Sequence, residues 1–285
     1  MGIIVTGATG HLGRLVIEEL LEKVPADQVT AVVRNKEKAA DLTERGVRIA
    51  VADYNAPHTF DGLFSAGDKV LLISSTGTDR VGQHRVVVEA AKAADVALLA
   101  YTGTAAALKA TLADDHRATE QVIRASGVPY VLLGNYWYHE NETGQLAQIL
   151  THGAVVRAAG DGRVASATRA DYAAAAAAVL TGEGHENKTY ELGGDEAWSF
   201  ADFAAEIGRQ TGREIVYTPV SVDTLSGILT DAGVPGPFVA TLAGVDASIA
   251  KGELAVLTGD LSRLIGRPTT PIADFITAAL KALEG

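Results

Sequence analysis

The chain of 285 residues contains no cysteine. Disulfide bonds, thiolate nucleophiles and cysteine-ligated metals are therefore excluded. Its seven histidines are scattered, and none is followed by a second histidine in His-x-x-x-His spacing, so no metal site is expected. No Gly-x-Ser-x-Gly nucleophile elbow is present either.

The sequence also lacks a targeting pattern. The N-terminus runs directly into the apolar stretch Ile3–Val5, with no basic region or cleavage site. The alanine run at Ala173–Ala178 is too short to cross a bilayer. We therefore expect a cytoplasmic protein. The net charge of −11 repels nucleic-acid backbones and anionic lipid surfaces, so neither nucleic acid nor a membrane is an expected partner.

Short apolar runs alternate with helical patterns in the first half of the chain. Strands are expected at Ile3–Thr6, Val29–Val33, Arg48–Val51, Lys69–Ile73, Ala97–Tyr101 and Tyr130–Leu133. Helices are expected between them at Leu12–Glu22, Lys36–Arg45, Val81–Ala94 and Asp115–Ala125. Nearly continuous apolar strands indicate a parallel sheet that is covered on both faces. The pattern predicts an α/β, Rossmann-type doubly wound parallel sheet with a smaller, mixed α/β C-terminal domain.

The second half is less regular. Strands are expected at Ala154–Arg157, Thr189–Leu192 and Ile215–Thr218, and Ser199 is expected to cap a helix over Phe200–Thr211. We expect residues 1–134 to form an NADP-binding Rossmann domain, completed by parts of 152–184. Residues 135–151 and 185–285 are expected to form a smaller substrate-side domain.

The strongest motif follows the first strand. Thr6-Gly7-Ala8-Thr9-Gly10-His11-Leu12-Gly13 places three glycines in G-x-x-G-x-x-G spacing at the start of a helix. The first glycine would permit a tight turn, the second would admit a pyrophosphate, and the third would let the helix pack closely on the strand. Amide groups at the helix N-terminus would face the negative charge. The motif predicts a dinucleotide site.

Arg34 follows the second strand, where an acidic residue would bind a ribose diol and favour NAD. A guanidinium can instead hold a 2′-phosphate through paired, charge-assisted hydrogen bonds. Lys36 and Lys38 add positive potential nearby, although both are also ordinary residues of a solvated helix start. The sequence therefore predicts NADPH as the cofactor.

Two further strand ends should border this site. Asp53, after the third strand, is suited equally to an adenine amino group and to capping the following turn. Ile73-Ser74-Ser75-Thr76 ends the fourth strand, and ligands of parallel sheets bind beyond the carboxyl ends of the strands. Serine and threonine are also common turn residues, so their individual roles stay open.

Taken together, these motifs resemble the NmrA-like branch of the atypical short-chain dehydrogenases/reductases, and within it the bacterial NADPH:quinone oxidoreductases and related triphenylmethane reductases. The resemblance covers almost the whole chain. It is carried by Thr6–Gly13, Val33–Asn35, Ala52–Tyr54, Leu71–Ser75, Gln83–Arg85, Ala100–Thr102, Trp137–Asn141, Ala159–Gly162, Ala165–Ala176 and Leu264–Thr270.

The resemblance implies NADPH binding, with a quinone or other conjugated acceptor above the nicotinamide. It also implies the cofactor-binding residues Gly7, Ala8, Thr9, Gly10, His11, Leu12, Arg34, Ile73, Ser74, Ser75, Asn135, Tyr136, Trp137, Tyr138, His139 and Glu140. Two positions depart from the family pattern. Gly134 stands where relatives usually carry arginine, and Gly103 stands where they usually carry serine. The polar contacts and the reaction at those positions are therefore open.

No tyrosine is followed by lysine four residues later, so the usual Tyr-x-x-x-Lys proton donor is missing. Reduction of a simple ketone needs such a donor because an alkoxide is strongly basic. Hydride addition to a quinone gives a delocalised, far less basic anion. The pattern favours a quinone-type acceptor over a sugar or steroid alcohol.

The catalytic residue is unknown from sequence. Tyr101 and Thr102, at the end of the fifth strand, are candidates to polarise the acceptor oxygen, and Tyr138 is a third candidate. Tyr136, Trp137 and Tyr138 are suited to stacking on a flat acceptor, and equally to a place in the core. The alternative function is a non-catalytic NADP(H)-binding redox sensor. The sequence leaves a homodimer open.

Overall fold

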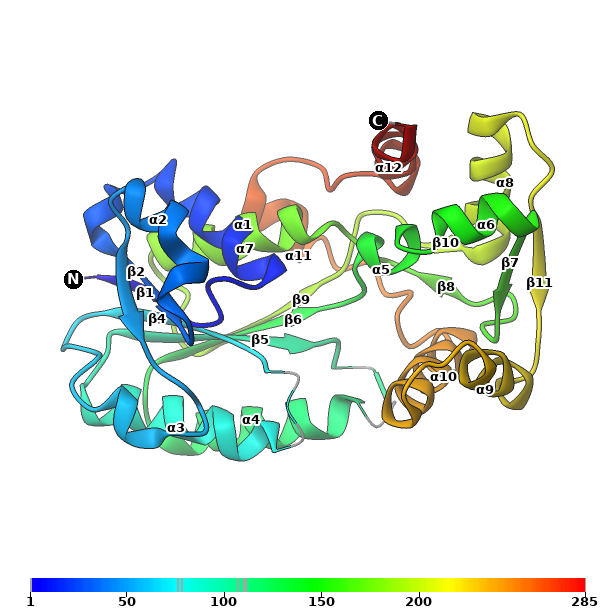
Figure 1. Cartoon of the computed structure of the whole chain (residues 1–285). Coiled ribbons are helices and arrows are strands. Elements are labelled where there is room, and N and C mark those ends of the chain that lie inside the picture. The colour runs from blue at the N-terminus through cyan, green and yellow to red at the C-terminus, as the bar shows by residue number, and fades with distance from the viewer. Residues whose placement is uncertain (1, 76, 78, 107, 110–111, 285) are drawn as a thin grey trace. The chain divides into compact units, whose positions relative to one another are not determined.

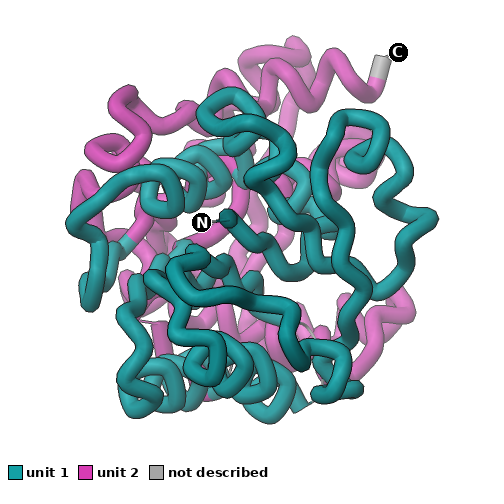
Figure 2. Tube along the Cα trace, turned by 90° about the vertical axis from the view of Figure 1, so that its left-hand side faces the viewer, with its two compact units in different colours: residues 1–104, 115–135, 169–191 teal, residues 105–114, 136–168, 192–285 magenta. Residues whose placement is uncertain are grey.

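The computed structural model describes residues 2–75, 77, 79–106, 108–109 and 112–284. Its residues form two compact units (Figure 2). Unit 1 contains residues 1–104, 115–135 and 169–191, and unit 2 contains residues 105–114, 136–168 and 192–285. Thr76, which we expected beside the site, lies outside the described residues.

Unit 1 is built on a seven-stranded sheet in the order β3-β2-β1-β4-β5-β6-β9. The strands are β1 (Ile3–Val5), β2 (Val29–Val33), β3 (Arg48–Val51), β4 (Lys69–Ile73), β5 (Leu98–Thr104), β6 (Tyr130–Asn135) and β9 (Lys188–Leu192). Parallel pairing joins the sheet from β3 to β6, and Ile3 pairs with both Val29 and Lys69. The predicted doubly wound Rossmann-type fold is confirmed.

Helices cover both faces of this sheet (Figure 1). One face carries α1 (His11–Leu21) and α7 (Arg169–Thr181), and the other carries α3 (Arg80–Ala93) and α4 (Leu112–Ser126). Short elements complete unit 1: η1 (Ala26–Gln28), η2 (Lys36–Ala39), α2 (Ala40–Glu44) and η3 (Pro57–Phe60). The alanines at 173 and 175–177 are buried, and their small side chains let α7 pack closely on α1.

Several observed boundaries differ from the expected ones. Residues 105–114 were expected in the first domain but belong to unit 2. Segment 36–45 was expected as one helix, but it begins as the 3-10 helix η2, whose N-terminus is capped by the Asn35 side chain, which accepts a hydrogen bond from the Glu37 amide at 2.8 Å. Residues 185–191 were expected in the second domain. They belong to unit 1 because β9 adds to the sheet edge beside β6.

Unit 2 contains two small sheets and a separate core. Its strands pair as β8 (Arg163–Val164) with β10 (Trp198–Ser199), and as β7 (Ala154–Arg157) with β11 (Val216–Pro219). Its helices are α5 (His139–Thr143), α6 (Leu146–His152), α8 (Phe200–Thr211), α9 (Val222–Asp231), α10 (Gly236–Ala250), α11 (Asp260–Ile265) and α12 (Ile272–Glu284). The predicted cap at Ser199 is present as a full capping box with Asp202. No described helix has the length and apolarity needed to cross a membrane.

Candidate functional site

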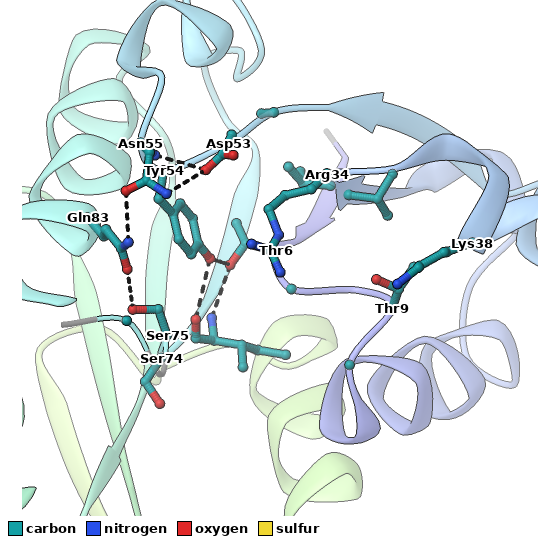
Figure 3. A pocket seen from close by; sticks show the side chains of 17 residues that line it. Thr6, Thr9, Arg34, Lys38, Asp53, Tyr54, Asn55, Ser74, Ser75 and Gln83 are labelled. Atoms are coloured by element: carbon teal, nitrogen blue, oxygen red, sulfur yellow. Dashed lines mark hydrogen bonds between the residues drawn. The ribbon is translucent and has the colours of Figure 1, made fainter. Parts of the chain in front are cut away.

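A cavity of about 520 Å³ opens at the carboxyl ends of β1, β2, β3 and β4, entirely within unit 1 (Figure 3). Its volume falls in the usual range for small-molecule and cofactor sites. The lining residues are Thr6, Gly7, Thr9, Gly10, Val32, Val33, Arg34, Lys38, Ala52, Asp53, Tyr54, Asn55, Ile73, Ser74, Ser75, Gly77 and Gln83. The cavity lies where the order of a doubly wound sheet reverses, which is the general ligand position for such folds.

The glycine loop has the geometry that its spacing predicts. Gly7 has φ of +61°, a conformation that side chains rarely adopt. A Cβ atom on Gly13 would lie 2.3 Å from the Gly7 carbonyl oxygen, so only glycine allows this close approach of helix and loop. No side chain in the described part of the chain caps the N-terminus of α1. Its first amides therefore offer an anion site at the cavity wall.

Two exposed cations line the same cavity. Arg34 follows the last residue of β2, and Lys38 lies in η2 (Figure 3). Among the described residues, Arg34 makes no ion pair, whereas nearby Arg14 is already bound to Asp41 at 2.6 Å. A guanidinium without an internal partner is available for an anionic ligand group.

A hydroxyl pair joins three strand ends at the cavity floor. The Tyr54 hydroxyl donates to Thr6 Oγ1 at 2.7 Å, and the Thr6 hydroxyl donates to the Leu71 carbonyl at 3.1 Å. Thr6 Oγ1 also accepts from the Ile73 amide at 3.1 Å. Burial raises the pKa of Tyr54 to about 12, so this phenol stays protonated as a donor. The pair fixes the ends of β1 and β4 relative to each other.

The opposite wall is held by an amide bridge (Figure 3). Gln83 of α3 accepts a hydrogen bond from the Ser75 hydroxyl at 2.6 Å and donates to the Asn55 side chain at 3.0 Å. Asp53 accepts from the Asn55 amide at 2.9 Å, which is the turn-capping alternative of the two roles considered for it. Asp53 also lines the cavity, so capping leaves its carboxylate at the site.

Most of the predicted cofactor residues of unit 1 line this cavity, namely Gly7, Thr9, Gly10, Arg34, Ile73, Ser74 and Ser75. Ala8, His11 and Leu12 belong to the same loop but are not part of the lining, and Ala8 and Leu12 are buried. Asn135 ends β6 and is also buried.

The catalytic candidates of unit 1 lie within the fold. Tyr101 is fully buried, and its hydroxyl forms a 2.7 Å hydrogen bond with His116 Nδ1. Burial raises the pKa of Tyr101 well above the ordinary value of a phenol. Thr102 is buried too, and its hydroxyl accepts from the Ser74 amide at 3.0 Å. Neither belongs to the cavity lining. Thr102 therefore contacts Ser74 of the cavity wall, whereas Tyr101 contacts His116 of α4.

The remaining candidates, Tyr136, Trp137, Tyr138, His139 and Glu140, belong to unit 2. Tyr136 is buried in the core of that unit. The backbone of Tyr138 pairs with that of Ala167 in an isolated parallel β-bridge. His139, the first residue of α5, is buried. Its Nε2–H donates to the Thr270 carbonyl at 3.0 Å, and its Nδ1 lies 2.8 Å from the Ser166 hydroxyl.

Trp137 connects to a buried ion cluster in the same unit. Its Nε1–H donates to Glu142 at 2.7 Å, and Arg157 pairs with both Glu142 and Asp246. The side chains of Glu142 and Asp246 are only 3% and 1% exposed. Together with His139, these contacts show that much of the segment is bound into unit 2.

Sequence reasoning missed Tyr54 and Gln83 as parts of the cavity wall. Tyr54 follows a strand end directly, so the rule that located Ser74 and Ser75 would also have located it. Gln83 carries no such signal, because its position depends on how α3 packs against the sheet. Across the described residues, no group of three or more acidic or histidine side chains is arranged to bind a metal ion.

The chain matches known proteins along almost its whole length. The NAD(P)H-binding family model matches residues 7–183. Quinone oxidoreductase 2 of Escherichia coli is 44% identical, over 96% of this chain and 97% of that protein. The structure of an E. coli NADPH-dependent quinone oxidoreductase with NADPH has a TM-score of 0.95 at 43% identity, covering 98% of this chain and 99% of that one.

A second solved relative supports the same grouping. Citrobacter sp. triphenylmethane reductase, solved with NADP(H), has a TM-score of 0.92 at 43% identity and covers 98% of this chain and 100% of that one. The predicted family is thereby confirmed. The chain belongs to the NAD(P)H-binding family and, within it, to the NmrA-like atypical short-chain dehydrogenases/reductases.

Proposed function

We propose that this protein is an NADPH-dependent oxidoreductase that transfers a hydride to a quinone or a similar conjugated acceptor. The observation that carries the cofactor assignment is one cavity that combines the N-terminus of α1 with the guanidinium of Arg34, neither of which has a side-chain partner among the described residues. The 44% identity to E. coli quinone oxidoreductase 2 supports the acceptor class.

Different cavity residues are assigned to different chemical groups of the cofactor. The amides of the Gly7–Leu12 loop hold the pyrophosphate, and Gly10 leaves room for it because it has no side chain. Arg34 binds the 2′-phosphate in a paired geometry, and Lys38 adds positive charge at the same end. Ile73, Ser74 and Ser75 border the cofactor along the β4 end of the cavity. The family resemblance also implies Asn135 to Glu140 as cofactor-binding residues.

When bound, NADPH supplies a hydride from its nicotinamide ring. A quinone that accepts the hydride becomes a delocalised hydroquinone anion, which then takes one proton to give the hydroquinone. Because that anion is weakly basic, no Tyr-x-x-x-Lys pair is required, and none is present in the sequence. The protein then acts mainly by positioning both reactants and excluding water.

Of the three catalytic candidates, Thr102 and Tyr138 fit better than Tyr101. The Tyr101 hydroxyl is bound to His116 and its pKa is raised by burial, so it is a poor proton donor to an anion of low basicity. Unit 1 is proposed to bind the dinucleotide, and unit 2 is proposed to supply the acceptor side. The cytoplasmic location stays a prediction, and a homodimer stays open.

The function is tested by following NADPH consumption with a panel of small quinones. NADH serves as the cofactor control and a cationic triphenylmethane dye as the acceptor control. Quinone-dependent turnover that prefers NADPH supports the proposal. Tight NADPH binding without turnover on any acceptor would contradict it and would instead indicate an NADP(H)-binding redox sensor.

A further inference from the structure

A histidine that plays no part in the function above lies directly behind the Ser74–Ser75 wall of the cavity. His84, on α3, is completely buried, and its Nε2 accepts the Ser75 amide proton at 2.9 Å. The preceding residue, Gln83, accepts the Ser75 hydroxyl proton at 2.6 Å. Two consecutive residues of one helix therefore accept from both hydrogen-bond donors of Ser75.

The contacts of His84 define its protonation. A ring nitrogen that accepts an amide proton carries no hydrogen, so neutral His84 has its single N–H at Nδ1. That nitrogen lies 2.8 Å from the Thr119 hydroxyl on α4, which therefore accepts its proton. Thr119 is fully buried and selects this tautomer by giving Nδ1–H its partner. A charged imidazolium would have no lone pair left for Ser75.

The groups packed around His84 also favour its neutral form. Arg80 of α3 places a positive charge nearby, and burial together with Arg80 lowers the pKa of His84 to about 4. Tyr101 of β5 hydrogen-bonds His116 of α4, and Arg80 lies 3.4 Å from His116 Nε2. These contacts tie the histidine to the sheet and to both helices on that face.

We infer that His84 is a positioning residue for the nucleotide, acting through the Ser75 amide while Thr119 fixes its tautomer. It touches neither substrate nor cofactor. The inference rests on the proposed function, because Ser74 and Ser75 are expected to border bound NADPH. A neutral acceptor at this point keeps the Ser75 amide in one position before the nucleotide binds, which lowers the entropy cost of binding.

The test compares paired variants. In His84→Gln the amide oxygen can reach the position of Nε2 and accept from Ser75, whereas His84→Phe fills the space without an acceptor. We expect His84→Phe to raise the NADPH dissociation constant about five- to ten-fold, from the loss of one buried hydrogen bond. His84→Gln should stay within about two-fold of wild type. Turnover at saturating NADPH should change little, so that the effect falls on KM.

A second pair tests the tautomer. Thr119→Val removes the acceptor for Nδ1–H and should weaken NADPH binding in the same direction, whereas Thr119→Ser keeps the hydroxyl and should bind as wild type does. Nitrogen-15 NMR of the wild-type histidines reports the tautomer directly and requires no variant to fold. We expect Nδ1 to be protonated and Nε2 to be unprotonated at neutral pH.

An Nε2–H tautomer, or a charged His84 at neutral pH, would overturn the inference. Unchanged NADPH affinity in folded His84→Phe would overturn it as well, while leaving the proposed function intact. Failure of the wild-type protein to bind NADPH would overturn the proposed function, and with it the positioning role.

Discussion

The cavity of unit 1 and the Trp137–Glu142 segment of unit 2 use polar side chains in opposite ways. In the cavity, Arg34 has no internal ion partner among the described residues, and no side chain there caps α1. In unit 2, Glu142 is paired with Arg157 and also accepts from Trp137. Polar groups left available mark a place for a ligand, whereas groups satisfied within the fold mark structure.

The comparison separates two observable effects. Changes at the cavity should alter nucleotide affinity more than stability, because the ligand supplies the missing partners. Changes at the ion cluster of unit 2 should alter stability first, because they leave buried charges without partners.

Arg157→Met should cause the largest loss. It leaves the buried carboxylates of Glu142 and Asp246 without their cation, which costs about 3–5 kcal/mol of unfolding free energy. Arg209→Met removes an exposed pair with Glu206 and should leave the unfolding free energy nearly unchanged, because water screens this pair. Urea unfolding of both variants measures the difference. If both variants lost only a small and equal amount of unfolding free energy, the ion cluster around Arg157 would not stabilise unit 2.

Gly13→Ala should be nearly as damaging, although it adds only one methyl group. The new Cβ would meet the Gly7 carbonyl oxygen at 2.3 Å, so loop and helix must separate at a cost of about 3 kcal/mol. NADPH affinity should fall as well, because the same loop forms the phosphate site.

Gly227→Ala is the matched control for that change. This exposed glycine of α9 has open space around it, so alanine should stabilise the helix by about 0.5–1 kcal/mol. Thermal unfolding distinguishes the two variants. A Gly13→Ala protein as stable as wild type would contradict the close packing of α1 on its loop.

Mild acid should destabilise unit 1 through its buried histidines. Burial lowers the pKa of His84 to about 4 and that of His116 to about 3, from an ordinary value of 6.5. Between about pH 6.5 and pH 4 the unfolded chain therefore binds more protons than the folded one, and stability falls as the pH falls. The expected loss over this range is about 2.5–3 kcal/mol for each of the two histidines.

The double variant His84→Gln, His116→Gln should show a flatter dependence of unfolding free energy on pH, because neither side chain can take up a proton. His58→Gln, which changes an exposed histidine, should keep the wild-type slope. A double variant with the full wild-type slope would assign the acid sensitivity to other groups.

The fold was accessible from sequence because the central strands of its sheet, β1, β2, β4, β5 and β6, are largely buried. Val29–Val33 and Lys69–Ile73 are nearly continuous apolar runs, and the structure gives them the same bounds. The ends of the Rossmann strands then located Arg34 and Ser75 without further information. The assignment of residues 185–191 to the second domain was wrong, because the local pattern that predicted a strand at Thr189–Leu192 does not show which sheet the strand joins.

The rest of the site depends on packing that sequence patterns do not encode. Gln83 reaches the cavity wall only because α3 lies against β4, and a helical pattern does not specify that position. An aromatic run such as Tyr136–Tyr138 suits a stacking surface and a core equally well. The structure places Tyr136 in a core, at 5% exposure. The burial of Tyr101 beside His116 also depends on tertiary packing, so the sequence pattern did not predict it.

The central claim is that Arg34 selects NADPH at the cavity of unit 1, and nucleotide titration of wild type and Arg34→Ala tests it most directly. Loss of a charge-assisted contact should weaken NADPH about ten-fold, or about 1.4 kcal/mol. NADH binding and unfolding free energy should change little, and Lys36→Ala, outside the cavity lining, serves as the control. Equal loss of affinity for both nucleotides, or none for NADPH, would contradict the account.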